Sequence, residues 1–327
     1  MTSSTKETEL TMPLDKLDQK IIAELFQDAR ISHSLLGKKV GASKEVVNYR
    51  ISRLLKQGII TKFIPLIDFS RQGYMNYRVQ LKFNHRDKAL WHSFFRTISQ
   101  TSWMAELQGN WDLVVLFWVK TSAEFSAIIS QIQSQFKQDI QEMLITIVDT
   151  IYHFPPRFLG GQNMPVEKQY KIGTHKDPPL QLKEIEIKIL KELLEDGRIP
   201  LLELARNIHC SATTVHYHLK NLLKQKVIVA FVPVINPTAA GFTHFKIMIQ
   251  LINPAQKGQL RVRLAQEKGT MYITEALGQS DLEFEFVTEK INDLFNLLEK
   301  VSDQIPFKKY EIIFNNREVL VNEMPLQ

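Results

Sequence analysis

Cysteine, long apolar runs and nucleotide-binding motifs are what this sequence has least of. Cys210 is the single cysteine among 327 residues, which excludes an intramolecular disulfide framework and a cysteine-based zinc site and is typical of the reducing cytoplasm. No stretch approaches the roughly 18 apolar residues of a membrane helix. We find no glycine-rich phosphate loop, no HExxH motif and no nucleophile elbow. The sequence therefore predicts a cytoplasmic protein without a membrane partner, a cofactor, a metal site or a catalytic site.

Strong charge of one sign is also absent. The formal net charge is +6 and the calculated pI is about 9.1, which permits a polyanionic partner without requiring one. Hydrophobic residues make up 44% and charged residues 23% of the chain, as in ordinary globular proteins, and the length suffices for about two to four compact domains. The placement of the charges, rather than their sum, must therefore identify the partner.

The main positive feature is an internal repeat. Residues 182–242 align with residues 14–74 without a gap at an offset of 168, and the pairs include Asp28 with Asp196 and Tyr49 with Tyr217. Such a register predicts that one structural unit occurs twice. We call these two units the first copy and the second copy.

The repeated stretch has the pattern of a winged helix-turn-helix. Apolar residues at helical spacing predict a first helix that ends at 28–30, a short second helix that ends at Gly41, and a third helix that Ser43 caps and Gly58 ends. Residues 59–60 and 63–67 then read as a strand pair, the expected wing. Three helices with a tight turn before the third and a short β ribbon describe this DNA-binding motif.

A βαββαβ series follows each winged helix, with apolar alternation in its strands. Its predicted order is ferredoxin-like, and Gly109-x-x-Asp112 in the first copy recurs as Gly278-x-x-Asp281 in the second. In the first copy we expect strands at 77–83, 103–108, 113–120 and 143–152 with helices at 88–99 and 122–136. In the second we expect strands at 245–251, 272–277, 281–288 and 309–318 with helices at 255–267 and 290–304.

The predicted fold class is α+β, with two winged helices that are each followed by a ferredoxin-like domain. A stretch rich in Pro, Gly and Lys separates the two copies and reads as a linker, with a strand at 168–172. The expected divisions are a flexible tail at 1–13, winged helices at 14–70 and 182–238, ferredoxin-like sensing domains at 74–154 and 242–322, and the linker at 155–181.

The first copy resembles the Lrp/AsnC (leucine-responsive) family of transcriptional regulators. The matching residues are Leu17-Asp18, Asp28-Ala29-Arg30, Val40-Gly41-Ala42-Ser43, Arg50-Ile51 and Gly58-Ile59-Ile60. The second copy keeps Asp196 and Arg198 but has His218 in place of the arginine and Lys226 in place of the glycine. The resemblance covers nearly the whole chain, as two family units fused in one polypeptide. It implies that each winged helix is joined to a ligand-sensing (RAM-type) βαββαβ domain and that the sensing domains dimerise.

The resemblance places DNA contacts on the third helix of each winged helix, which we call the recognition helix. Asn48 and Arg53 are expected at base edges, and Lys44 and Arg50 at phosphates. The second copy lacks arginine there, so reading of a different half-site, weaker binding and structural mimicry all stay open. The predicted contacts are Ser43, Lys44, Asn48, Tyr49, Arg50 and Arg53 in the first copy, and Ser211, Thr213, His216, Tyr217, Lys220 and Asn221 in the second.

Family members sense small effectors, often amino acids, near the turn between the two central strands of the sensing domain. The turns from Gly109 to Asp112 and from Gly278 to Asp281 occupy that place. Asp112 and Asp281 are candidate contacts to an ammonium group. An aspartate after a tight turn also commonly bonds the backbone of the turn itself, and the sequence leaves both roles open.

These patterns predict a sequence-specific regulator that binds double-stranded DNA, is not an enzyme, and forms a homodimer or higher oligomer through its ferredoxin-like domains. One alternative is a siroheme decarboxylase-like enzyme on the same fold, in which His85, His92 or His153 would line a basic cleft. The wing argues against it, because this chain has Thr61-Lys62-Phe63 where those enzymes are arginine-rich. Another alternative is an adaptor that recruits the transcription machinery.

Overall fold

The structure, a computed structural model of the chain, describes residues 14–85, 87–160, 169–173 and 177–321. The predicted flexible tail at 1–13 lies outside these residues. Within them, no helix is long and apolar enough to span a membrane.

Both copies begin with three helices and one strand. Ser43 and Ser211 cap the recognition helices, and their hydroxyls accept hydrogen bonds from Val46 N and Thr214 N. The apolar faces of both helical triplets belong to one continuous core. In the first copy the elements are α1 (Lys16–Gln27), α2 (His33–Val40), α3 (Lys44–Lys56) and β1 (Ile60–Ile67), and in the second they are α6 (Glu184–Glu195), α7 (Leu201–Asn207), α8 (Ala212–Lys224) and β7 (Ile228–Ile235).

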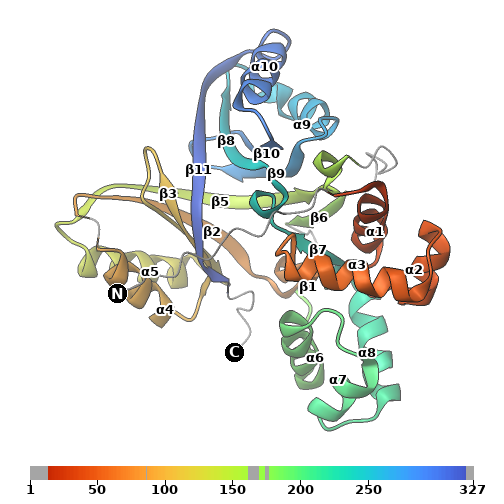
Figure 1. Cartoon of the computed structure of the whole chain (residues 1–327). Coiled ribbons are helices and arrows are strands. Elements are labelled where there is room, and N and C mark those ends of the chain that lie inside the picture. The colour runs from red at the N-terminus through yellow and green to blue at the C-terminus, as the bar shows by residue number, and fades with distance from the viewer. Residues whose placement is uncertain (1–13, 86, 161–168, 174–176, 322–327) are drawn as a thin grey trace, which may run out of the picture.

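The predicted wing within each copy is wrong. The chain runs as a single strand from Ile60 to Ile67, and β1 pairs antiparallel with β7 of the other copy, with Phe63 opposite Pro233. Thr61 and Lys62 lie in extended backbone rather than in a turn, so no hairpin forms and the hydrogen-bonding edge of β1 finds its partner in β7. The two winged helices therefore share one two-stranded ribbon (Figure 1).

Two arginines join the winged helices a second time. Arg30 donates hydrogen bonds to the carbonyls of Gly197 (2.7 Å) and Ile199 (2.8 Å), and its guanidinium lies over the Phe231 ring. Arg198 returns the same contacts to the first copy, bonding two backbone carbonyls and covering a phenylalanine ring. The ribbon and these reciprocal contacts fix the position of one winged helix against the other.

The βαββαβ order is confirmed in both copies. Short 3-10 helices, η1 (Phe69–Gln72) and η3 (Thr238–Ala240), lead into these domains, and η4 (Pro254–Gln256) precedes α9. The elements of the first copy are β2 (Met75–Phe83), α4 (Lys88–Thr97), β3 (Thr101–Gln108), β4 (Leu113–Val119), α5 (Ser122–Gln135) and β5 (Ile140–His153). Those of the second are β8 (Thr243–Leu251), α9 (Lys257–Ala265), β9 (Thr270–Leu277), β10 (Leu282–Thr288), α10 (Ile291–Ser302) and β11 (Phe307–Val321).

The eight strands of these domains form one closed sheet. Its order is β2-β4-β3-β11-β8-β10-β9-β5, and β5 also pairs with β2. The last strand of each copy is long enough to pair within its own domain and then with the other domain, β5 with β2 and β9, and β11 with β8 and β3. Closure leaves one face of the sheet inside, while α4, α5, α9 and α10 pack on the outer face (Figure 1).

The predicted linker contains ordered elements that tie the first winged helix to the sheet. It holds η2 (Arg157–Leu159) and β6 (Tyr170–Gly173), and β6 extends the sheet beside β5. The Tyr170 hydroxyl donates to the carbonyls of Phe26 and Gln27 at the end of α1, which lack partners inside the helix.

Candidate nucleic-acid interface and effector pocket

The recognition helix of the first copy presents a mixed polar face. Lys44, Asn48 and Tyr49 are exposed, and the Tyr49 side chain is 62% exposed. The opposite stripe of Val47, Ile51 and Leu54 is buried in the core that both winged helices share, as its helical spacing predicts. These exposed side chains have the donors and acceptors that reading of base edges and phosphates requires.

Arg50 and Arg53 turn inward instead of outward. Both guanidinium groups contact the carboxylate of Asp18 on α1, which is fully buried, and Arg50 also contacts Asp15. Hydrogen bonds from the Asp18 backbone and from the Arg50 guanidinium hold the pKa of Asp15 at about 2, against the opposing effect of burial. In this geometry Arg50 could reach a phosphate, and Arg53 a base edge, only by leaving a buried carboxylate.

The recognition helix of the second copy exposes a different set of side chains. Thr213, His216, Tyr217 and Lys220 face outward, and Tyr217 is 64% exposed, close to the value for its counterpart Tyr49. A tyrosine is thus the large exposed side chain that the two recognition helices have in common.

Asn221 and His218 of the second copy point toward α6. His218 Nδ1 lies 3.1 Å from Glu186 Oε1, and the Asn221 amide donates to the same oxygen at 3.4 Å. His218 is buried. Asn221, predicted as a DNA contact, therefore occupies the place of Arg53 in an inward-facing contact.

The two candidate effector turns have the same internal bonding. Gly109 and Gly278 have positive φ values of 114° and 155°, which favour glycine. The Asp112 carboxylate accepts a hydrogen bond from Phe83 N, and the Asp281 carboxylate accepts one from Leu251 N. Each aspartate thus fastens its turn to the end of the neighbouring strand.

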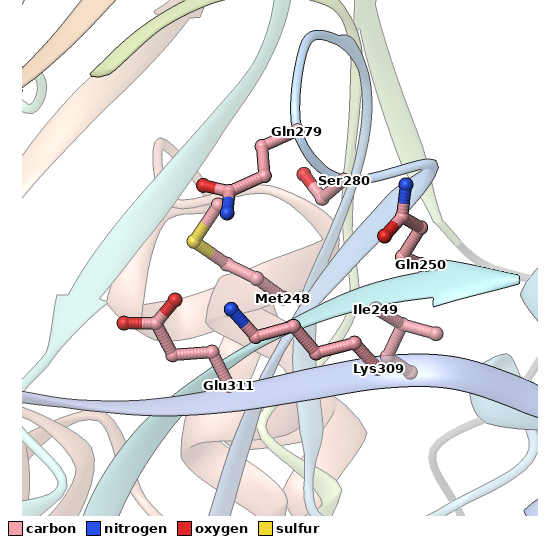
Figure 2. A pocket seen from close by; sticks show the side chains of 7 residues that line it. All are labelled: Met248, Ile249, Gln250, Gln279, Ser280, Lys309 and Glu311. Atoms are coloured by element: carbon pink, nitrogen blue, oxygen red, sulfur yellow. The ribbon is translucent and has the colours of Figure 1, made fainter.

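A hollow opens beside the second turn, on the inner face of the sheet. It is lined by residues of β8, β11 and the turn between β9 and β10. Figure 2 shows the side chains of Lys309 and Glu311 on β11, with Gln279 and Ser280 of the turn opposite them. The Asn110 amide of the first turn donates to Glu311 at 2.9 Å. The hollow therefore combines a cation, an anion and two amide side chains of the second copy, and its anion also contacts the first copy.

The three histidines of the enzyme alternative have separate surroundings. His85 contacts Asp139, His92 lies 3.1 Å from Glu106, and the His153 ring packs edge-on against Tyr272. Burial lowers the pKa of His153 to about 4, despite an opposing effect of Glu285, so this ring is neutral at pH 7. Across the described ranges, no three His, Cys, Asp or Glu side chains are grouped so that they could hold a metal ion.

The acids beneath the recognition helices are not among the site residues that the sequence predicts. Asp18 and Glu186 precede Arg50 and His218 by 32 residues in both copies. That equal separation was the available signal, because an acid kept in register with a basic or polar residue on another helix indicates a buried contact.

Comparisons with known proteins agree with this architecture at two levels. Residues 14–61 and 182–229 match the family described as winged helix-turn-helix DNA-binding. Among curated relatives, an HTH-type transcriptional regulator, FL11, of Pyrococcus furiosus is 26% identical over 37% of this chain and 80% of its own length. The HTH-type transcriptional regulator Rv2324 of Mycobacterium tuberculosis is 25% identical over 44% of this chain and 98% of its own.

A solved structure shares the fold of the whole duplicated chain. The siroheme decarboxylase NirDL superposes with a TM-score of 0.65 over 94% of both chains at 16% identity. At that identity the likeness concerns the fold alone. The regulators thus match one copy each, and the decarboxylase matches the arrangement of both.

Proposed function

We propose that this chain, which resembles two units of the Lrp/AsnC family of transcriptional regulators fused in one polypeptide, is a sequence-specific regulator that binds double-stranded DNA. The observation that carries the proposal is the pair of exposed recognition helices, each with a polar face around a tyrosine, held in one body by the shared ribbon. The proposed location is the cytoplasm, and the proposed division of the chain follows the boundaries that the sequence predicts.

The proposed reading residues of the first copy are Lys44, Asn48 and Tyr49, with Ser43 as the helix cap next to a phosphate. Those of the second are Thr213, His216, Tyr217 and Lys220, next to the cap Ser211. Because the two faces differ in sequence, the proposed operator has two unequal half-sites. The two ferredoxin-like domains already pair within one chain, so a single polypeptide supplies two winged helices. Higher oligomers would add further pairs of winged helices.

The proposed effector is a small molecule that carries both a positive and a negative group, such as an amino acid. Its site is the hollow beside the second turn, where Glu311 would face an ammonium group and Lys309 a carboxylate (Figure 2). Asp112 and Asp281 would then support the turns through their backbone bonds, with Gly109 and Gly278 allowing the turns to form. Addition of amino acids to a DNA-binding titration, with Lys309→Met as the variant, tests this site.

The DNA proposal is tested by selecting bound duplexes from random-sequence DNA with the full chain and measuring their affinity at several salt concentrations. Lys44→Ala should weaken binding and lower the slope of log K against log salt by about 1. Asn48→Ala should relax the base preference in one half-site by about 1–3 kcal/mol. Lys137→Ala, an exposed change on the ferredoxin-like domain, is the matched control and should leave the slope unchanged.

Two further measurements separate the competing functions. A shift in the absorbance of siroheme on mixing, without selection of any duplex, would favour a tetrapyrrole enzyme. Capture of transcription factors without DNA selection would favour an adaptor. Retention of a defined duplex whose affinity depends on Lys44 supports the proposed regulator.

A further inference from the structure

A buried acid lies beneath each recognition helix at the same place in both copies. Asp18 on α1 is 0% exposed, and Glu186 on α6 is 3% exposed. Each also accepts a hydrogen bond from the backbone at the start of its own helix, from Asp15 N at 3.1 Å and from Lys183 N at 2.9 Å. Both carboxylates are therefore fixed before they contact the recognition helix.

The contacts occupy equivalent positions, but the chemistry differs. In the first copy Asp18 receives two arginines, Arg50 at 3.2 Å and Arg53 at a shorter distance. In the second copy Glu186 receives His218 and Asn221. The four partners are related by the same offset of 168 residues that relates the helices, so the contact has been kept while every residue in it has changed.

The lengths of the side chains compensate for each other. Aspartate is one methylene shorter than glutamate, and arginine is longer than histidine or asparagine. The short acid is found with the long bases, and the longer acid with the shorter partners. This fit keeps a contact between the first helix and the recognition helix in each copy. We call this contact the tether.

We propose that Asp18 and Glu186 are positioning residues that set the orientation of the two recognition helices for DNA. This inference rests on the proposed DNA-binding function. It also reassigns Arg50 and Arg53 from direct DNA contacts to the positioning of α3.

The first test compares matched acids in the full chain. Asp18→Asn and Glu186→Gln remove the buried charges, whereas Glu24→Gln and Glu192→Gln remove partly exposed acids from the same helices, which contact Lys39 and Asn207 at equivalent positions. Affinity for a duplex selected with the wild-type chain should fall about tenfold or more for the buried pair and less than twofold for the partly exposed pair. Equal effects of buried and partly exposed substitutions would overturn the positioning role.

The second test exchanges the tethers. Asp18→Glu with Arg50→His and Arg53→Asn gives the first copy the tether of the second, and Glu186→Asp with His218→Arg and Asn221→Arg does the reverse. Hydrogen exchange at one pH reports the opening of each recognition helix. Asp18→Asn should increase the opening of α3, and Glu186→Gln that of α8, by about tenfold. Each complete exchange should return the opening to within about threefold of the wild-type value, because it supplies a tether whose side chains fit.

The outcomes separate this inference from the proposed function. If no duplex is selected by the wild type, the DNA function fails, while hydrogen exchange still tests the tether. Opening of α3 and α8 that is the same in the single substitutions, the complete exchanges and the wild type would overturn the tether. Increased opening in the single substitutions that the complete exchanges reverse supports it.

Discussion

Two helix ends that are closed by glycine in the first copy are closed by larger residues in the second. Gly41 and Gly58 have φ values of 74° and 69°, and the equivalent His209 and Lys226 have φ values of 55° and 56°. The left-handed conformation costs a residue with a side chain roughly 1–2 kcal/mol. The second winged helix therefore keeps the backbone path of the first at an energetic disadvantage at two positions.

Substitution of Lys226 by glycine should stabilise the second winged helix. Relief of the backbone strain is partly offset by the greater freedom of glycine in the unfolded chain, so the expected gain is about 0.5–1 kcal/mol. Gly58→Lys is the matched reverse change, and no atom lies within 4 Å of the position of its added Cβ. It should therefore cost about 1–2 kcal/mol through the backbone alone. Urea unfolding of both variants measures these changes, and a loss of stability in Lys226→Gly would contradict the strain.

The shared ribbon and the two reciprocal arginines together hold one winged helix against the other. Arg30 and Arg198 bond backbone carbonyls of the opposite copy, and burial lowers the pKa of both, partly offset by Asp28 and Asp196. The positive charge of Arg30 lowers the pKa of Arg198 further. The two positive charges thus repel each other, while the hydrogen bonds and the ring contacts hold the winged helices together.

Arg30→Lys should loosen this contact although it keeps the charge. A lysine ammonium lacks the planar fork that serves two carbonyls at once, and an unmet buried carbonyl costs about 1–3 kcal/mol. Exchange of the Gly197 amide, which bonds Phe63 O at 2.9 Å, should accelerate accordingly when followed by NMR. The exposed Arg206→Lys serves as control. Unchanged protection of Gly197 in Arg30→Lys would show that the ribbon alone holds the two copies.

The order of elements across the whole molecule is predictable from the sequence, because it depends on local periodicity and on the repeat. The wing and the closed sheet are not, since β1 pairs with β7 and β3 pairs with β11 far along the chain, and alternation does not identify a distant partner. The direction of Arg50 was also beyond the sequence. It lies next to the buried stripe of α3, where a long side chain reaches either solvent or an acid on another helix.

One ion cluster joins the two domains inside the closed sheet. Arg78 on β2 and Lys246 on β8 occupy equivalent positions in the two copies, and both contact Glu283 of β10, whose side chain is 0% exposed. The first copy has Val114 at the equivalent position, one residue after the start of β4 as Glu283 is in β10. A single carboxylate from the second copy therefore serves one cation from each domain.

Glu283→Gln should destabilise the protein strongly at neutral pH and little in acid. Burial raises the pKa of Glu283, but Arg78 and Lys246 outweigh it and hold the pKa at about 2, below the ordinary value of 4.5. The stabilisation is therefore complete above about pH 4.5 and is lost as the pH falls toward 2. Removal of the charge at pH 7 leaves the buried Arg78 and the half-buried Lys246 without this partner, for an expected loss of about 3–5 kcal/mol. The exposed Glu142→Gln, next to Lys82, should cost less than about 1 kcal/mol. Urea unfolding at pH 7, 5 and 3 measures the difference from wild type, and a difference that stays constant over this range would show that the carboxylate is not charged in the folded protein.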